Sequence, residues 1–314
     1  MRLFLLIVGL LWYTCAATQS VFQHEIAVIT ENDNYDLGFT DRYYSNGFVF
    51  QYNGAATRSR GTHRLLHHVE LAHKVYNPYK NNQSVEQVLQ EMDRPYAGWL
   101  SASYHQSRLS FKHHVLRYGV TAGVMGPTAL GSQVQNGWHR LIGLYRVLGW
   151  EYQLRNEAGL NVAVDYYHSL VAAAPERQLT LHVVAKAMLG NTFTNAAAGL
   201  LLKTGNIHPD AWSGFWNGNL GGKPEHPGKK EFIFFVEPLL VWQGYNATVQ
   251  GGLFNRNKGP YTTGVAPLVL QARTGLVYTG NRIGFRWYYT FRTREGNLMK
   301  AGEQWGTIGL SVRF

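Results

Sequence analysis

The sequence predicts an all-β protein: a twelve-stranded antiparallel transmembrane β-barrel with a short helix in one outward loop. The clearest signal lies in residues 283–292, where apolar and polar side chains alternate with a period of two and two arginines fall on the polar side. Residues 305–314 repeat the alternation and end in phenylalanine, as outer-membrane barrels often do. Arginines facing inward beside so apolar a face do not fit a sandwich core. They fit a barrel with an apolar outside and a polar inside.

Ten similar segments precede these two. The first is the weaker strand 24–30, and the others are residues 44–53, 65–75, 96–106, 115–124, 160–167, 178–189, 196–203, 231–242 and 264–276. The even total is typical of single-chain bacterial barrels, and Tyr and Trp occur near many strand ends, as in an interfacial belt. A soluble β-sandwich or a lipocalin-like barrel is the alternative, because alternation alone does not distinguish a protein core from lipid.

Residues 1–20 have the layout of a secretory signal peptide: one positive charge, an apolar run, then small residues at Ala16 and Ala17. We expect cleavage near Ala17, so that residues 21–314 form the barrel domain. The apolar run has only about half of the ~20 residues that a membrane-spanning helix needs. The only cysteine, Cys15, lies within the predicted signal peptide, so we expect the mature chain to have neither disulfides nor thiolate metal sites. The residues just before Cys15 do not fit the cleavage motif of a lipoprotein.

The formal net charge is +10. In an exported protein this excess indicates contact with anionic surfaces such as lipid phosphates. A nucleic-acid partner is excluded, because the sequence lacks the clustered Lys and Arg and the fold signatures of nucleic-acid-binding modules.

With the N-terminus on the periplasmic side, the outward connections are residues 31–43, 76–95, 125–157, 190–195, 243–263 and 293–302. The third contains the predicted helix, of about four turns, because apolar residues recur from Val134 at Trp138, Leu141, Tyr145 and Leu148. We expect this apolar face to pack on the barrel rim or the membrane surface, with His139 at its margin. The long connection 204–230 has no explanation in this scheme.

Residues 31–47, ENDNYDLGFTDRYYSNG, gather carboxylates and amides on one loop. These are hard oxygen ligands that suit Ca²⁺, although they are also the ordinary residues of a solvated turn. The topology places Asn32, Asp33, Ser45 and His139 together at the outward mouth. A histidine can act as a general base, and an aspartate can hold a cation that polarises an ester carbonyl. The alternatives are that Asp33 only caps a turn and that Ser45 only faces the lumen.

Several motifs occur in a fixed order along the chain: END at 31–33, DRYYSNG at 41–47, DRPYAGW at 93–99, MGP at 125–127, QVQNGWHR at 133–140 and GWEYQL at 149–154. Together they resemble the LpxR-type lipid A 3′-O-deacylase family, and the resemblance covers essentially the whole mature chain. It implies a twelve-stranded barrel in the outer membrane of a Gram-negative bacterium. The implied activity is Ca²⁺-dependent hydrolysis of the ester that holds the 3′-linked acyloxyacyl group on lipid A.

By the same resemblance, His139 matches the family's catalytic histidine, Asn32 and Asp33 match its Asn-Asp pair, and Ser45 matches its hydroxyl residue at the start of the second strand. The implied mechanism has His139 deprotonate a water while Ca²⁺ near Asp33 stabilises the oxyanion. The rival mechanism makes Ser45 the nucleophile with His139 as its base.

The sequence departs from the family pattern at two places. The family's acidic residue after the histidine is replaced at or near Tyr145, and Glu151 or Glu157 could substitute for it. The family's basic pair in the second outward loop also has no clear counterpart. The candidates for binding the lipid A phosphates are Arg42, Lys80, Arg94 and Arg140. For Arg94 the alternative is that the DRPY motif only fixes the entry to the next strand.

The sequence therefore predicts a monomeric outer-membrane hydrolase that acts on lipid A in lipopolysaccharide. An outer-membrane phospholipase with the same site is the first alternative. A non-catalytic porin or adhesin is the second, although bulky inward side chains argue against an open pore.

Overall fold

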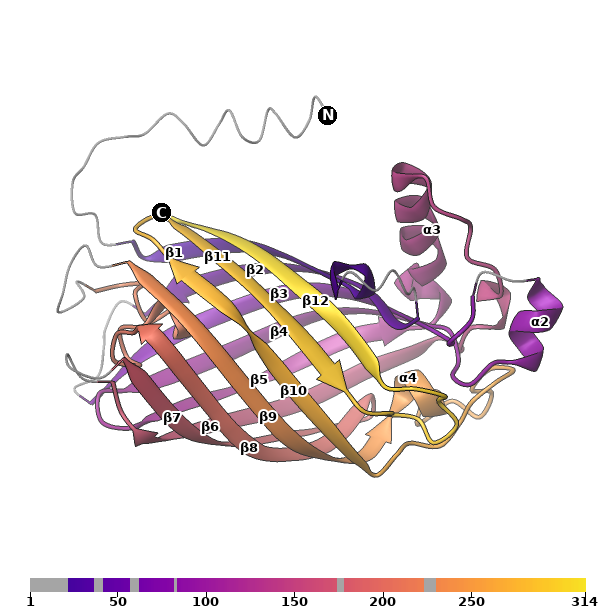
Figure 1. The fold of residues 1–314 in the computed structure, drawn as a ribbon. Helices are drawn as coiled ribbons and strands as arrows, with labels where there is room; N and C mark the ends of the chain where they lie inside the picture. The colour runs from indigo at the N-terminus through magenta and orange to yellow at the C-terminus, as the bar shows by residue number, and fades with distance from the viewer. Residues whose placement is uncertain (1–21, 37–41, 57–61, 82–83, 174–177, 223–229) are drawn as a thin grey trace.

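The computed structural model describes residues 22–36, 42–56, 62–81, 84–173, 178–222 and 230–314. These residues form a closed barrel in which β1 pairs with β12 and every other strand pairs with its sequence neighbours, all antiparallel (Figure 1). The predicted fold class is thus confirmed. The predicted signal peptide, with Cys15 and the expected cleavage near Ala17, lies outside the described residues.

Every predicted strand is present, and most extend a few residues beyond the predicted bounds. The strands are β1 (His24–Asn32), β2 (Tyr43–Ala55), β3 (His63–Asn77), β4 (Ala97–Ser110), β5 (His114–Met125), β6 (Glu157–Val171), β7 (Leu179–Gly190), β8 (Phe193–Asn206), β9 (Glu231–Asn246), β10 (Leu268–Thr279), β11 (Ile283–Arg292) and β12 (Glu303–Arg313).

The barrel wall is apolar outside and polar inside. In β9, Phe232 and Phe234 are exposed, whereas Glu237 on the other face is buried. On β11, Arg292 points inward and forms a 3.0 Å ion pair with Glu303 of the neighbouring strand. Successive side chains of a strand point to opposite faces, so one alternating sequence supplies both the lipid-facing surface and the polar lumen.

The long connection between β8 and β9 folds back into the lumen and closes it at the end where the C-terminus lies (Figure 1). We call its described part, residues 207–222, the plug. The guanidinium of Arg64 donates hydrogen bonds to three plug carbonyls, those of Ala211, Gly218 and Leu220. Asp210 of the plug is held by Lys203 and His182, each at 2.6 Å. The length of this connection is therefore explained by its position as a plug.

The helices lie at the opposite end of the barrel: α2 (Val85–Gln90), α3 (Gly131–Ile142) and α4 (Ala247–Gln250) (Figure 1). Short 3₁₀ turns accompany them, including η1 (Asp33–Asp36) and η3 (Trp150–Tyr152). Within the described ranges, no helix has the length and apolar character needed to cross a membrane.

The predicted helix corresponds to α3, but its bounds and its buried face differ from the prediction. It ends at Ile142, because Gly143 adopts a left-handed conformation with φ 77°. Tyr145 consequently lies outside the helix. The buried face carries Gln135 and His139, while Leu141 is 76% exposed. His139 is therefore buried rather than at the margin of the apolar face, and Val134 and Trp138 of that face are half-buried beside it.

Candidate active site

α3 is attached to the outer surface of the barrel wall near the helix-bearing end. The ring of His73 on β3 donates a hydrogen bond from Nε2 to the carbonyl of Ala129, just before α3, at 2.7 Å. Trp138 of α3 contacts Phe48 of β2 edge-on, with ring centroids 5.9 Å apart. Phe48 lies on the same strand face as the exposed Phe50, so α3 covers the outside of the wall rather than the lumen.

A small apolar core outside the lumen fixes the position of α3. Its buried members come from β3, α2 and the segments around them: Val75, Val88, Met92, Tyr96, Val147 and Trp150. Trp150 also donates a 2.9 Å hydrogen bond from its indole N–H to Oε1 of Gln135 on α3. The helix is therefore supported from the wall and from the connection that follows it.

His139 lies on the buried face of α3 and is only 2% exposed. Its Nδ1 is 2.7 Å from the carbonyl oxygen of Tyr145. A carbonyl oxygen only accepts hydrogen bonds, so Nδ1 carries the proton, and Nε2 of the neutral ring bears the lone pair. This is the tautomer that a general base requires. The Tyr145 hydroxyl donates to Oδ1 of Asn81 at 2.9 Å, which ties this turn to the preceding connection.

Asn32 is the last residue of β1, and Ser45 lies near the start of β2, both at the helix-bearing end of the barrel. Nδ2 of Asn32 donates to Oδ1 of Asn46 at 2.6 Å, and Nδ2 of Asn77 donates to Oγ of the fully buried Ser45 at 2.8 Å. The register of β2 against β3 shifts between Tyr44 and Asn46, so that Ser45 is the extra residue of a β-bulge. A bulge re-aims the side chain that it carries. Ser45 is therefore not simply a lumen-facing strand residue.

Asp33 begins η1 directly after Asn32 and is 1% exposed. Its Oδ2 accepts a 2.7 Å hydrogen bond from the backbone N–H of Arg42. Across the described part of the chain, no three His, Cys, Asp or Glu side chains gather to hold a metal ion. A hard cation at Asp33 would therefore depend on this carboxylate, main-chain carbonyls and water, all of which are ordinary Ca²⁺ ligands. The donor chemistry fits Ca²⁺, while Asp41 of the same loop lies outside the described residues.

Two contacts connect the segments that carry the predicted catalytic residues. The contact between Trp138 and Phe48 places α3 against β2, two residues along the strand from Asn46. The hydrogen bond between Asn32 and Asn46 joins that end to β1 and hence to Asp33. The segments that carry the candidate histidine, hydroxyl, amides and carboxylate thus lie at the helix-bearing end of the barrel, and these are side chains that ester hydrolysis uses.

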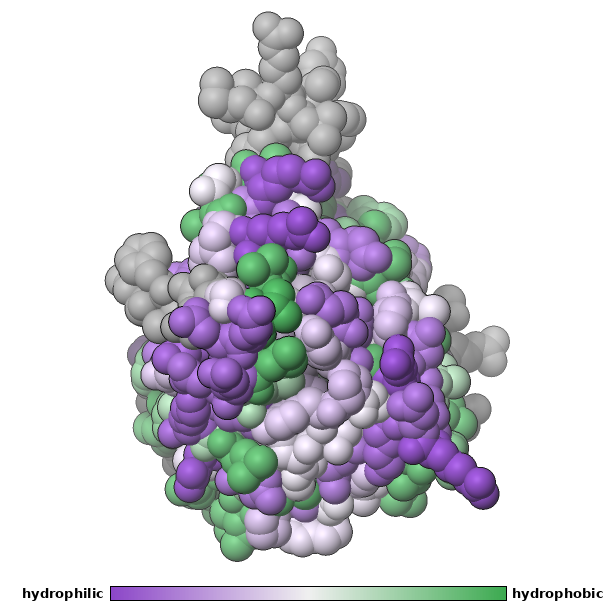
Figure 2. Space-filling view, turned by 90° about the vertical axis from the view of Figure 1, so that its right-hand side faces the viewer, coloured by the Kyte–Doolittle hydropathy of each residue, from purple (hydrophilic) through white to green (hydrophobic). Residues whose placement is uncertain are grey.

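A second group of residues, which is cationic, surrounds the ring of Tyr79 at the same end of the barrel. The guanidinium of Arg42 lies 4.9 Å from the ring centroid, and the ammonium of Lys300 lies 5.9 Å from it. Lys80 and Lys300 both pair with Glu91, at 2.9 and 3.0 Å. Polar residues dominate this end of the molecule, with a narrow group of hydrophobic ones among them (Figure 2). Lys300 was missed by sequence reasoning, because the loop before β12 carries no motif.

The other two predicted phosphate ligands are Arg94 and Arg140. Arg94 is fully buried and forms a 2.7 Å ion pair with Glu295 and a 3.0 Å hydrogen bond with Thr248. These partners fix the polypeptide at the entry to β4 and leave no exposed guanidinium for a ligand. This agrees with the alternative that the DRPY motif only fixes the entry to the next strand. Arg140 is exposed on α3.

Neither proposed substitute for the missing acidic residue faces His139. Oε1 of Glu157 accepts from the backbone of Phe254 at 2.9 Å, and Glu151 is exposed in η3. One partner of His139 is the main-chain carbonyl of Tyr145. Sequence reasoning could not identify this partner, because any residue supplies a carbonyl.

The chain was compared with known families and structures. A family model described as "Outer membrane protein LpxR" matches residues 3–314. The chain belongs to the LpxR family. Among solved structures it is similar to "LpxR from Salmonella typhimurium", with 20% identity, coverage of 92% of this chain and 100% of that chain, and a TM-score of 0.74. LpxR and this chain therefore share a fold, and membership of the family places the protein in the outer membrane.

More distant similarities reach other outer-membrane barrels. The β domain of the Bordetella autotransporter BrkA is 7% identical, with coverage of 94% of this chain and 100% of that chain and a TM-score of 0.46. The translocator domain of NalP from Neisseria meningitidis is 10% identical, with coverage of 100% and 94% and a TM-score of 0.43. No curated protein sequence matches the chain.

Proposed function

We propose that this protein is an outer-membrane lipid A deacylase that hydrolyses the ester of the 3′-linked acyloxyacyl group. Membership of the LpxR family supports the class of enzyme. The observation that carries the proposal is the position of His139, which lies buried between α3 and the outer wall with its Nδ1 proton engaged by the Tyr145 carbonyl. A base on the outside of the barrel is placed where an acyl chain of a membrane lipid can reach it.

In the proposed reaction Nε2 of His139 removes a proton from a water, and the resulting hydroxide attacks the ester carbonyl carbon. The carbonyl of Tyr145 orients the ring and stabilises the imidazolium that forms. The imidazolium then returns the proton to the departing sugar oxygen as the tetrahedral intermediate breaks down. Asn32 and Asn46, joined by a hydrogen bond, keep the ends of β1 and β2 together beside the reacting group.

Asp33 is the proposed anchor for Ca²⁺, with main-chain carbonyls of the 31–36 segment as further ligands. When bound, the ion supplies a Lewis acid that stabilises negative charge on the ester oxygen. Ser45 is held by Asn77 and remains the rival nucleophile.

The cations around Tyr79 are proposed to bind a lipid A phosphate. Arg42, Lys80 and Lys300 bring three positive charges beside the two carboxylates of Glu91 and Asp93. An excess of positive charge at the outer rim favours a phosphorylated glycolipid over a neutral one. We expect the protein to act as a monomer, because one chain carries the whole site.

The test is hydrolysis of purified lipid A by the detergent-solubilised barrel, with wild type compared with His139→Ala. Removal of a general base is expected to lower the rate by about 10²–10⁴-fold. The matched control is His114→Ala, at the opposite end of the barrel, which is expected to keep the wild-type rate. A folded His139→Ala barrel with the wild-type rate would remove the proposed base.

A further inference from the structure

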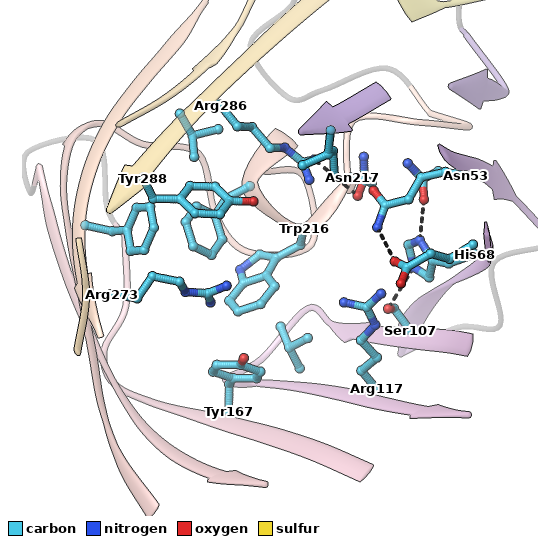
Figure 3. A pocket seen from close by; sticks show the side chains of 17 residues that line it. Asn53, His68, Ser107, Arg117, Tyr167, Trp216, Asn217, Arg273, Arg286 and Tyr288 are labelled. Atoms are coloured by element: carbon cyan, nitrogen blue, oxygen red, sulfur yellow. Dashed lines mark hydrogen bonds between the residues drawn. The ribbon is translucent and has the colours of Figure 1, made fainter. Parts of the chain in front are cut away.

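The lumen contains a cavity of about 220 Å³ between the plug and the inner faces of the strands (Figure 3). This volume is far above the roughly 10–15 Å³ that one ordered water requires. Aromatic rings line one part of it, including those of Trp216 and Tyr288, and polar groups such as Asn53 and Ser107 line the other. The cavity lies inside the barrel and is separate from the candidate active site on the outer wall.

Three arginines from different strands line the cavity: Arg117 on β5, Arg273 on β10 and Arg286 on β11. Their side chains point toward the common space in Figure 3. Among the described residues that line the cavity, Glu70 is the only carboxylate, and it accepts a 2.8 Å hydrogen bond from Gln51. The lining is therefore cationic.

Arg273 is already neutralised by the protein. Its guanidinium lies 2.7 Å from Glu237 and stacks near the rings of Phe235 and Tyr288. Glu237 also pairs with Lys186 at 3.0 Å. This arginine consequently needs no further anion.

Arg117 and Arg286 differ from Arg273 in this respect. Within the described ranges neither forms an ion pair, and the buried Nε of Arg117 has no hydrogen-bond partner. Asp165 is the cross-strand neighbour of Arg117, yet the two side chains do not come within ion-pair distance. Arg286 has one long contact, 3.5 Å from Nη2 to Oδ1 of Asn217 in the plug. Both arginines are half-buried and line a cavity in which Glu70 is the only carboxylate among the described residues, so the two guanidiniums favour an anion between them.

We propose that this cavity binds a small tetrahedral oxyanion of the phosphate type between Arg117 and Arg286. The planar fork of a guanidinium matches the oxygens of phosphate, and two forks suit a doubly charged anion. The oxyanion would be free phosphate or the phosphate group of a small ester. Bound there, it would link β5 and β11 to the plug through Asn217.

The test is calorimetric titration of inorganic phosphate into the folded barrel in detergent and low-salt buffer. Saturable binding of one phosphate per chain is expected, weakened at least tenfold in Arg117→Gln and in Arg286→Gln. The matched control is Arg108→Gln, an exposed arginine on β4 that is expected to bind as wild type does. Equal binding by all four proteins would assign phosphate to the outer surface, and no binding by wild type would show a cavity filled by water alone. Either result would overturn the proposal.

Two further measurements keep the test independent of folding. Phosphate is expected to raise the thermal unfolding midpoint of wild type and not that of Arg117→Gln. Arg117→Lys keeps the positive charge and loses the planar guanidinium, so it is expected to fold and to bind phosphate more weakly. A wild-type affinity in this folded variant would contradict recognition of the anion by the guanidinium. A parallel titration with glycerol phosphate identifies the source, since tighter binding than inorganic phosphate indicates an ester and weaker binding indicates the free anion.

Discussion

Nδ1 of His139 lies 2.7 Å from the carbonyl oxygen of Tyr145, six residues further along the chain. This hydrogen bond lets a main-chain carbonyl orient the ring at Nδ1, the nitrogen that a carboxylate often binds in catalytic histidines. The carbonyl is held in place because α3 ends at Ile142, before the left-handed Gly143, and the following turn is tied to Asn81 by the Tyr145 hydroxyl. The shape of this turn therefore contributes to the orientation of the base.

Tyr145→Phe is expected to lower the hydrolysis rate only modestly. The substitution removes the hydroxyl bond to Asn81 and leaves the carbonyl that holds His139. Loss of one such hydrogen bond corresponds to about 1 kcal/mol, or roughly a fivefold decrease in rate. Steady-state kinetics on purified lipid A checks this. A loss as large as that of His139→Ala would show that the tyrosine hydroxyl itself takes part in the reaction.

Ser45→Ala is expected to reduce hydrolysis by about tenfold without abolishing it, if Ser45 helps to place the attacking water rather than attacking the ester. Wild type should then show no covalent acyl adduct during turnover. Intact-protein mass spectrometry of quenched reactions measures this directly. An acyl adduct that appears in wild type and is lost in Ser45→Ala would instead establish the serine as the nucleophile.

Lys300→Gln is expected to raise the KM for phosphorylated lipid A several-fold and to leave kcat nearly unchanged, because the lysine contacts the bound lipid equally before and during reaction. Dephosphorylated lipid A should show no difference between the two proteins. Lys112→Gln, an exposed lysine between β4 and β5 at the other end, serves as the control. An unchanged KM for both lipids would remove Lys300 from the phosphate site.

Asp210→Asn is expected to destabilise the plug. Burial raises the pKa of the Asp210 carboxyl, but the charges of Lys203 and His182 more than reverse this, so its pKa lies well below the ordinary value. A carboxyl with a lowered pKa contributes stability that is fully present above about pH 4 and is lost as the pH falls through the folded-state value. Removing the partner of the buried Lys203 is expected to cost about 3–5 kcal/mol.

Urea unfolding of wild type and Asp210→Asn at pH 5 and pH 8 measures this loss in the free energy of unfolding. The contribution of the Asp210 carboxyl should be the same at both pH values, because it is lost only below about pH 4. The double variant Asp210→Asn with Lys203→Met removes the unpaired cation and should recover part of the loss. A single variant as stable as wild type would show that the ion pair does not hold the plug.

Much of the barrel was predictable from the sequence because each strand's period of two is a local property. Segments 283–292 and 305–314 show this, since the inward Arg292 and the exposed Leu310 fall where the alternation placed them. The plug was not predictable. Its anchors, such as the bonds from Arg64 to Gly218 and Leu220, join residues more than 150 positions apart.

The residues of the candidate site were proposed from motifs, whereas their local geometry was not predictable. The motifs identified His139, Asn32, Asp33 and Ser45, but a β-bulge depends on the register of two strands and has no signature at Ser45. The apolar stripe from Val134 to Leu148 predicted the helix, but it predicted neither its end at Ile142 nor the burial of Gln135 and His139.

The most direct test of the central claim is mass spectrometry of lipid A from outer membranes that contain this protein, with and without a Ca²⁺ chelator, beside an Asp33→Ala variant. We expect wild type to remove the mass of the 3′ acyloxyacyl group, and we expect both chelation and the substitution to prevent the loss. Unchanged lipid A in the presence of a correctly inserted wild-type barrel would contradict the proposed deacylase, and release of fatty acid from glycerophospholipids in the same membranes would identify a phospholipase instead.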